Sequence, residues 1–497
     1  MLSPWRGWAD HEIKPLHARA RPREKCCAVA RQLVVTFNSG PLASVLGGGL
    51  QVFTLENIMT TTRRTVINGG MALATASALM GPAFLEWAKA WAQTTPWRPE
   101  QGAQLSLLRP KSFVRAEDEA FMAAMDAFTK ATGVKIGITR ESNDDVQPKA
   151  SVAASIGAGP DLIWGFYSLP HLFSNKCLDV TDVADYLGKK NGGWAPSAIV
   201  YGKDTGNKWI DIPICYGGAL VNYRISSLKK AGFSRFPVTT DEFLDYCKAV
   251  KANNTPGGFA LGHATNDANG WVYWCLWTHG GNTVDKSDKV IINSPETEKA
   301  LNFAKQLYDT MVPGVVAWND ASNNKAFLAN EIHWTNNSIS IYVAATKDPN
   351  LKAIAEDMDH AYWPVGPVGH PTEFHIAQIL FTMAYTKYPQ ACKALMAFLM
   401  EADQYNKWLF ASEGYMSQTL RAYAANPLWT EDPKRAAFRE AAERSLTLGG
   451  LGSVGGKATN AFFDFVLVDM FASFCTGRED AKGAMKIAER QLQRIYR

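Results

Sequence analysis

The sequence predicts an α/β fold with at least two units, each built on a mainly parallel sheet flanked by helices. Between residues 105 and 164, short apolar runs alternate with segments of helical periodicity, which is typical of strand–helix–strand units. A second series of helix-start patterns begins after residue 212. The chain of 497 residues is long enough for two or three domains.

The elements of the first unit follow one another closely. Residues 105–108 form a short apolar strand, and residues 117–132 form a helix in which Phe121, Met125 and Phe128 recur at helical spacing. A second strand covers residues 134–138. Residues 151–157 have a helical pattern, and residues 160–164 form a third strand. Ligands of such sheets bind beyond the carboxyl ends of the strands, which here places residues 165–168 near a site.

The second unit begins near Ile212-Pro213. Two segments, Val238-Thr239-Thr240-Asp241-Glu242-Phe243 and Ser294-Pro295-Glu296, each combine a capping Thr or Ser with an acidic first turn, so each begins a helix. Further helices are predicted over residues 389–410, 434–446 and 479–495.

An export signal is predicted ahead of both units. The paired Arg63-Arg64 is followed by an apolar run over residues 71–85 and by Ala90-Trp91-Ala92, a small-residue cleavage site. This layout is that of a twin-arginine signal over residues 59–92, with the mature protein in the periplasm and beginning near Gln93. Residues 1–58 have no sustained period, so we expect translation to start at Met59; a disordered extension is the alternative.

Composition excludes several classes of site. Residues 1–92 hold 10 of the 51 Lys and Arg and 5 of the 47 Asp and Glu, which leaves 41 − 42 = −1 for the remainder. Nothing there favours binding to nucleic acid or to an anionic membrane. The histidines lack metal-site spacing, and the six cysteines after the signal form no C-x-x-C pair. We therefore expect no metal, no cofactor and no nucleic acid.

Five short motifs follow one another in the order expected of one family. They lie at residues 159–165, 212–224, 228–243, 363–367 and 408–415. In this order they resemble the extracellular solute-binding proteins of family 1, the maltose-binding-protein-like receptors of ABC importers. The resemblance covers essentially all of residues 104–495.

The resemblance implies a two-lobed periplasmic binding protein of the type II kind, with hinge crossovers between the lobes. It places residues 104–212 and 373–412 in lobe 1 and residues 216–368 and 418–497 in lobe 2. It also implies a monomer that delivers a solute to an inner-membrane ABC permease, without catalysis. Departures from the motifs at Asn222-Tyr223, Trp334 and Met416-Ser417 leave the class of ligand open.

A carbohydrate (a sugar, oligosaccharide or polyol) is the first expectation for the ligand. Aromatic faces stack on the apolar face of a pyranose, while carboxylate and amide groups bind its hydroxyls. On this basis, and by position in the family's motifs, we expect ten ligand-binding residues: Asp161, Trp164, Tyr167, Tyr216, Asn269, Trp271, Trp334, Asn336, Glu373 and Tyr415. Each aromatic residue has packing in a core as its alternative role.

Two other functions remain open. The same receptor role for a polyamine, a glycerol phosphate or another small polar solute would change only the ligand. An exported glycan-active enzyme is a more distant alternative, because no pair of carboxylates and no G-x-S-x-G motif with the right flanks can be assigned.

Overall fold

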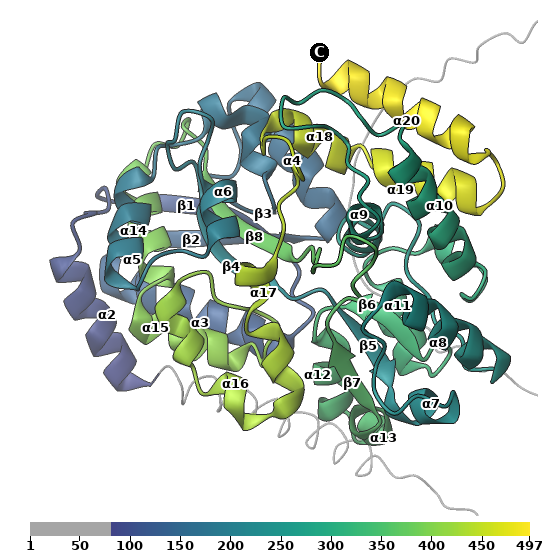
Figure 1. Cartoon of the computed structure of the whole chain (residues 1–497). Helices are drawn as coiled ribbons and strands as arrows, with labels where there is room; N and C mark the ends of the chain where they lie inside the picture. Colours follow the sequence, from purple (N-terminus) through teal and green to yellow (C-terminus); the bar gives the residue numbers. More distant parts are fainter. Residues whose placement is uncertain (1–80) are drawn as a thin grey trace, which may run out of the picture. The chain divides into compact units, whose positions relative to one another are not determined.

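The computed structural model describes residues 81–497, which form an α/β protein with two sheets (Figure 1). The predicted start at Met59, the paired Arg63-Arg64, residues 71–80 of the apolar run and the extension 1–58 lie outside the described residues. We call the part built on the five-stranded sheet lobe 1 and the part built on the three-stranded sheet lobe 2.

Lobe 1 contains the larger sheet, with strand order β2-β1-β3-β8-β4. Its strands are β1 (Gln104–Pro110), β2 (Lys135–Glu141), β3 (Leu162–Phe166), β4 (Ile212–Gly217) and β8 (Ile376–Thr382). Strand β1 pairs in parallel with β2 and β3, whereas β8 runs antiparallel to both β3 and β4. The sheet is therefore mixed, with one reversed strand supplied by a distant part of the chain.

Helices cover this sheet. They are α2 (Pro82–Thr94), α3 (Arg115–Thr132), α4 (Asn143–Ile156), α5 (Thr181–Lys190), α6 (Pro196–Gly202), α14 (Pro389–Leu399) and α15 (Ala402–Ala411), with the 3-10 segment η1 (Leu169–Lys176). Helix α3 begins with Glu117 and Asp118 in its first turn and ends at Gly133 with φ 79°. The single helix predicted over residues 389–410 is two helices, because the chain turns at Met400 and Glu401.

Lobe 2 differs from the predicted parallel arrangement. Its sheet has the order β6-β5-β7, with β5 (Leu220–Arg224) antiparallel to both β6 (Trp334–Asn337) and β7 (Met358–Ala361). The helices of this lobe are α7 (Ile225–Lys230), α8 (Thr240–Ala252), α9 (Asp267–Thr278), α10 (Pro295–Tyr308), α11 (Ser322–Leu328), α12 (Ser340–Lys347) and α13 (Lys352–Glu356), with η2 (Val315–Ala317) and η3 (Pro349–Leu351). The antiparallel pairing arises because β5 enters directly from lobe 1 while β6 and β7 run back toward it.

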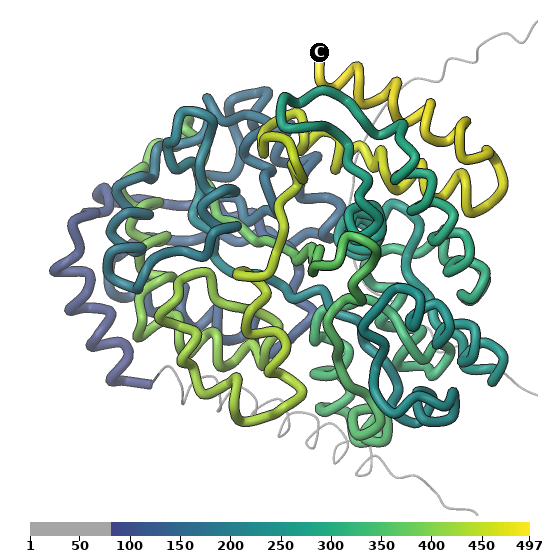
Figure 2. The backbone as a smooth tube through the Cα atoms, in the orientation of Figure 1, coloured from purple at the N-terminus to yellow at the C-terminus, as the bar shows by residue number. Residues whose placement is uncertain are grey.

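The chain crosses between the lobes at several places (Figure 2). It passes from β4 to β5 through Gly218 and Ala219, and it returns from β7 to β8 through residues 362–375. A bridge between Tyr216 and Ser417 ties the segment after α15 to the first crossing. These crossings lie beside the pocket described below.

The C-terminal part contacts both lobes. Its elements are η4 (Arg421–Ala425), α16 (Leu428–Glu431), η5 (Pro433–Phe438), α17 (Ala441–Arg444), α18 (Gly456–Phe463), α19 (Val466–Cys475) and α20 (Ala481–Ile495). The helix predicted over residues 434–446 is thus split into η5 and α17. Helix α17 packs on α6 and β4 of lobe 1, whereas α19 packs on α9 and α10 of lobe 2.

Residues Gly456–Cys475 are long and apolar enough to cross a membrane by composition, with a mean hydropathy of 1.3. The structure divides them at Phe465, whose φ of 54° ends α18 and starts α19. Most of their apolar side chains are buried against neighbouring helices. Their hydrophobicity is accounted for by packing inside the protein.

Candidate functional site

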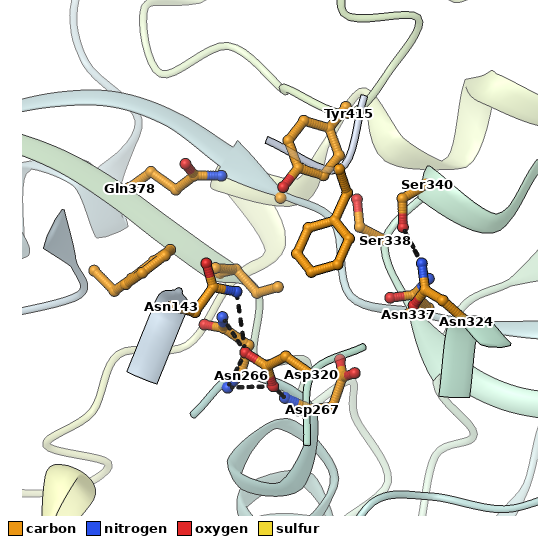
Figure 3. A pocket seen from close by; sticks show the side chains of 14 residues that line it. Asn143, Asn266, Asp267, Asp320, Asn324, Asn337, Ser338, Ser340, Gln378 and Tyr415 are labelled. Atoms are coloured by element: carbon orange, nitrogen blue, oxygen red, sulfur yellow. Dashed lines mark hydrogen bonds between the residues drawn. The ribbon is translucent and has the colours of Figure 1, made fainter. Parts of the chain in front are cut away.

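A pocket lies between the two lobes, at the carboxyl ends of β1, β2 and β3 (Figure 3). It holds about 390 Å³ of empty space, its open mouth included. Lobe 1 contributes Phe113, Asn143, Phe166, Gly217, Ile376, Gln378 and Tyr415, and lobe 2 contributes Asn266, Asp267, Asp320, Asn324, Asn337, Ser338 and Ser340.

The lobe 2 wall is built around the start of helix α9. The Asp320 carboxylate accepts hydrogen bonds from the backbone N–H groups of Asn266 (3.1 Å) and Asp267 (3.0 Å), and from the Asn266 side chain (2.8 Å). These are N–H groups that a helix leaves without partners, and a negative charge at this end is favourable. Asp320 therefore fixes the first turn of α9 at the edge of the pocket.

Hydrogen bonds join the lobes across the pocket mouth. The Asn143 side chain, at the start of α4 in lobe 1, donates to Asp320 Oδ2 (3.1 Å). The hydroxyl of Thr265 in lobe 2 donates to Asp144 Oδ1 (2.6 Å), and the Thr265 backbone N–H also donates to it (3.3 Å). The lobes are thus in direct polar contact beside the empty space.

Hydrogen-bond acceptors are in excess within the pocket. Four lining oxygens are buried and have no hydrogen-bond partner among residues 81–497: the Ser338 hydroxyl and the acceptors Asn266 Oδ1, Asp267 Oδ2 and Asn324 Oδ1. No lysine or arginine of the described chain lines the pocket. Buried acceptors without partners cost about 1–3 kcal/mol each. The pocket is therefore suited to a ligand that donates hydrogen bonds.

The two carboxyl groups of the pocket have unusual ionisation. Burial raises the pKa of Asp267 well above its ordinary value, and the nearby charge of Asp320 raises it further. Burial also raises the pKa of Asp320, against the effect of the backbone N–H groups that it accepts from. Desolvation and repulsion from a neighbouring carboxylate, Asp320 beside Asp267 and Asp144 beside Asp320, both favour the neutral carboxyl group.

Gln378 contributes a donor from the opposite wall. The Trp164 indole N–H donates to Gln378 Oε1 (2.9 Å), and an indole nitrogen can only donate. The amide oxygen must therefore face Trp164. The amide nitrogen of Gln378 then points toward the pocket, and no described residue accepts a hydrogen bond from it (Figure 3).

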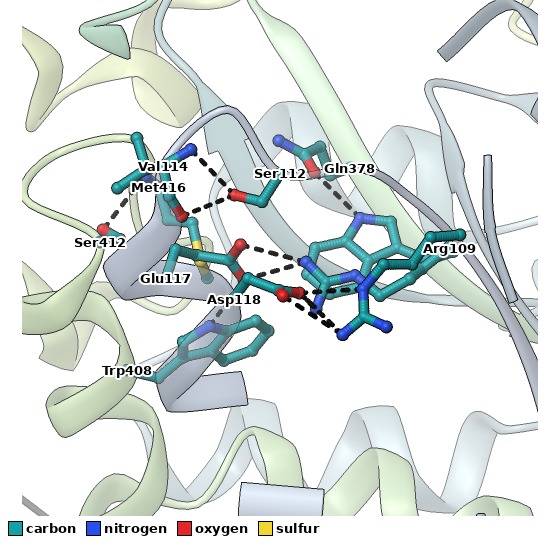
Figure 4. A network of polar contacts seen from close by, with 11 residues as sticks. Arg109, Ser112, Val114, Glu117, Asp118, Gln378, Trp408, Ser412 and Met416 are labelled. Atoms are coloured by element: carbon teal, nitrogen blue, oxygen red, sulfur yellow. Dashed lines mark hydrogen bonds and ion pairs between the residues drawn. The ribbon is translucent and has the colours of Figure 1, made fainter. Parts of the chain in front are cut away.

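Trp164 is itself fixed by a buried ion pair (Figure 4). The Arg109 guanidinium pairs with Glu117 at 3.0 Å and lies 4.5 Å from the centre of the Trp164 ring. The Trp408 indole N–H donates to the same Glu117 carboxylate (2.9 Å). This cluster sets the position of the Trp164 ring and, through it, the orientation of the Gln378 amide.

Comparison with known proteins agrees with this geometry. A family described as bacterial extracellular solute-binding protein matches residues 123–437. The chain belongs to this family.

Relatives of this solute-binding protein extend over most of its length. A probable ABC transporter-binding protein of Deinococcus radiodurans is 24% identical over 394 residues, which are 74% of this chain and 89% of the relative. The solved structure of maltose-bound T. maritima MalE3 has a TM-score of 0.68 at 20% identity and covers 79% of this chain and 99% of its own. A solute-binding protein of Thermotoga lettingae bound with α-D-tagatose has a TM-score of 0.68 at 18% identity, covering 80% and 100%. These structures confirm the two-lobed α/β fold.

The structure places several of the expected ligand residues of this solute-binding protein in its hydrophobic cores. Trp271 is buried in lobe 2, where its indole donates to the Ala260 carbonyl (2.7 Å). Trp334 is buried over Gly257, whose position leaves no room for a Cβ atom. Trp164 has the position described above. None of these rings lines the pocket, because each packs against other aromatic side chains.

Two expected tyrosines are also buried. The Tyr167 ring stacks on Phe374 at 5.0 Å, although its φ of 51° is rare for a residue with a side chain. Tyr216 donates its hydroxyl to Ser197 (2.7 Å). Their pKa values are raised by burial. Both lie near the crossings but outside the pocket lining.

The expected carboxylates have local partners. Asp161 precedes β3, at the end of the strand opposite the pocket, where it accepts hydrogen bonds from Ser106 and Thr386. Glu373 is buried and pairs with Arg444 (2.8 Å) and His375 (3.0 Å), and these partners lower its pKa against the effect of burial. These contacts account for both side chains structurally.

Three expected residues lie at or directly behind the pocket. Tyr415 lines it. Asn269 and Asn336 are buried behind the lining, and the Oδ1 atom of each has no hydrogen-bond partner within the described residues. Asn269 and Asn336, both expected as ligand-binding residues, thus lie next to lining residues of the polar wall and not in the lining itself.

The sequence reasoning missed several lining residues. Gln378 is a polar residue inside the apolar run of β8, and Asn143 follows the end of β2; both patterns could have been recognised. Asp320 and Ser338 lie in short connections between helices and strands, where the sequence has no periodicity or motif that marks a ligand site. Their role depends on contacts with residues far away in the sequence.

Proposed function

We propose that this protein is the exported receptor of an ABC importer and captures a carbohydrate (a sugar, oligosaccharide or polyol) between its two lobes. The observation that carries the proposal is the interlobe pocket, with its excess of buried acceptors, its amide donor and its aromatic residues Phe113, Phe166 and Tyr415. Hydroxyl groups donate and accept, so they satisfy both kinds of partner. Solved relatives carry maltose, α-D-tagatose and laminaribiose.

The mechanism requires binding alone. A ligand that contacts both lobes stabilises the arrangement in which they meet, and that arrangement would be the one recognised by the membrane permease. We propose no catalytic step and a monomeric receptor. The twin-arginine signal, the periplasmic location and the division into lobes at residues 104–212 with 373–412 and 216–368 with 418–497 belong to this proposal.

One observation favours a second class of ligand. Asp267 and Asp320 line the pocket without a basic side chain, so an organic amine would supply hydrogen-bond donors, and its positive charge would favour the ionised form of both carboxyl groups. The same absence of lysine and arginine disfavours a phosphate ester. A polyamine receptor is therefore the alternative that the pocket supports.

A thermal-shift screen tests the two classes. The purified protein is heated with a panel of sugars, polyols, polyamines and phosphate esters, each at two salt concentrations. A ligand at 100 times its dissociation constant stabilises the folded state by about 2.7 kcal/mol. A shift with a sugar or polyol that is insensitive to salt supports the proposal. A shift with amines alone that weakens with salt would show that the ligand is an amine and not a carbohydrate. Turnover of a glycan would show that the protein is an enzyme and not a receptor.

A further inference from the structure

Contact between the lobes brings carboxyl groups from both of them to one side of the pocket. Asp267 and Asp320 belong to lobe 2 and line the pocket, whereas Asp144 belongs to α4 of lobe 1 and meets lobe 2 at Thr265. Asp320 and Asp144 are charged neighbours of Asp267. The hydroxyl of Tyr167 is a further titratable group within reach of both pocket carboxyl groups. The lining of the pocket holds no lysine or arginine of the described chain to balance these acids.

The two pocket carboxyl groups have different sets of partners. Asp320 accepts hydrogen bonds from two backbone N–H groups at the start of α9 and from the side-chain amides of Asn143 and Asn266, and these donors favour its ionised form. Asp267 is only 3% exposed, and its Oδ2 atom has no hydrogen-bond partner in the described part of the chain. A neutral carboxyl group has an O–H that can donate, which is what this wall of unpaired acceptors lacks. Asp320 is therefore suited to remain a carboxylate, and Asp267 is suited to hold a proton.

The burial of Asp267 depends on the lobes being together. Phe113 and Phe166 of lobe 1 line the same pocket, and water takes their place when the lobes separate. With the lobes in contact, burial raises the pKa of Asp267 well above its ordinary value, and the charges of Asp320 and Asp144 raise it further. A carboxyl group that is solvated in one arrangement and buried in the other binds its proton more tightly in the buried one.

We infer that Asp267 takes up one proton when the lobes close, unless the ligand itself carries a positive charge. This inference rests on the proposed receptor function and adds a form of regulation to its site. The proton comes from the buffer, which is left with one proton fewer, and Asp320 remains a carboxylate. With a sugar or polyol, the neutral Asp267 donates its O–H to the ligand or to the polar wall. An amine brings its own donors and charge, so Asp267 stays ionised and no proton is taken up.

Acid favours the closed arrangement under this scheme. The closed arrangement holds a proton that the open arrangement releases above an ordinary pKa of about 3.9. As the pH rises from there toward the raised pKa of Asp267, the equilibrium constant for closure falls by up to about tenfold per pH unit. Asp144 favours closure through its hydrogen bonds to Thr265, whereas its charge opposes an ionised Asp267. Loss of Asp144 therefore opens the lobes most clearly at acid pH, where Asp267 is neutral.

Solution scattering of the purified exported protein, without ligand, tests the inference at about pH 5 and about pH 8. We expect the radius of gyration to be larger at the higher pH, because more molecules have separated lobes. Asp267→Asn cannot titrate and should have the same radius at both. Asp245→Asn, at an exposed acid of α8 outside the pocket lining, should respond like the unaltered protein. A constant radius in the unaltered protein, or an equal rise in Asp267→Asn, overturns the inference.

Calorimetry counts the proton directly and separates this inference from the proposed function. Binding of maltose, α-D-tagatose and spermidine is measured near neutral pH in two buffers that differ in their heat of ionisation. We expect an uptake approaching one proton with a sugar and none with spermidine. Binding of a sugar without proton uptake would keep the receptor and overturn the inference. A radius that depends on pH through Asp267, in a protein that binds neither sugar, would keep the inference and count against the carbohydrate.

Discussion

At the scale of single residues, the Gln378 amide owes its orientation to one contact. The Trp164 indole donates to its oxygen, and the buried Arg109–Glu117 pair holds the indole in place. Trp164, which was expected to contact the ligand, therefore has another role. Its ring packs in the core, and its N–H orients the Gln378 amide so that the amide nitrogen faces the pocket.

Trp164→Phe tests this arrangement. The phenyl ring is smaller than the indole and has no N–H donor, so the Gln378 amide is free to rotate and present either end to the ligand. Loss of one oriented hydrogen bond is worth about 0.5–1.5 kcal/mol, so we expect binding of the sugar found in the screen to weaken by about 2- to 12-fold in calorimetry. Trp277→Phe, a buried lobe 2 residue outside the pocket lining, should bind normally. Unchanged affinity in Trp164→Phe would refute the positioning role.

Asp211 predicts a dependence of stability on pH. It is fully buried, neither carboxyl oxygen has a hydrogen-bond partner among residues 81–497, and burial raises its pKa well above 3.8. The folded state then holds a proton that the unfolded state releases, so stability falls as pH rises above the unfolded value, by up to about 1.4 kcal/mol per pH unit. Asp211→Asn should make this decline shallower in urea titrations at pH 5 and pH 8. An identical slope would show that Asp211 is solvated in the folded protein.

At the scale of elements, individual helices and strands could be predicted from sequence better than the pairing of strands into sheets. The periodicity of Phe121, Met125 and Phe128 is local, and α3 forms where it indicated. Strand β8 comes from residue 376 onward and inserts between β3 and β4. The residues of β8 do not predict which strands it pairs with or that the pairing is antiparallel. Both are set by the path of the chain through lobe 2.

The site shows the same limit. Residue type and position in the family's motifs pointed to Asn269, which lies behind the pocket, and to Tyr415, which lines it. It could not separate aromatic residues that face a ligand from those that pack together, because the residue type is the same. Trp271 and Trp334 are buried among rings contributed by distant elements.

Helix α2 offers a prediction at this scale. Trp91→Ala should lower the free energy of unfolding by about 3–5 kcal/mol, the usual cost of truncating a large buried aromatic residue. Glu86→Ala on the exposed face of the same helix should change it by less than about 0.5 kcal/mol. Denaturant titration of residues 81–497, a chain that retains α2, measures both. Equal effects would mean that α2 is not docked in solution.

At the scale of the whole molecule, the lobes meet through Asn143–Asp320 and Asp144–Thr265 beside the pocket. These bonds exist only when the lobes are together, so they favour that arrangement even without a ligand. A receptor's apparent affinity depends on the fraction of molecules that can hold the ligand from both sides. Side chains that never touch the ligand can therefore adjust affinity.

Asp144→Ala removes one side of this contact while leaving the pocket lining unchanged. We expect the unliganded protein to shift toward separated lobes, seen as a larger radius of gyration in solution scattering, and the affinity to fall by about 2- to 12-fold for a bond worth about 0.5–1.5 kcal/mol. Saturating ligand should restore the compact form. Asp145→Ala is the matched control, because Asp145 accepts from Ser142 within lobe 1. If both variants bind alike, the Asp144–Thr265 contact contributes nothing to closure, and the ligand alone brings the lobes together.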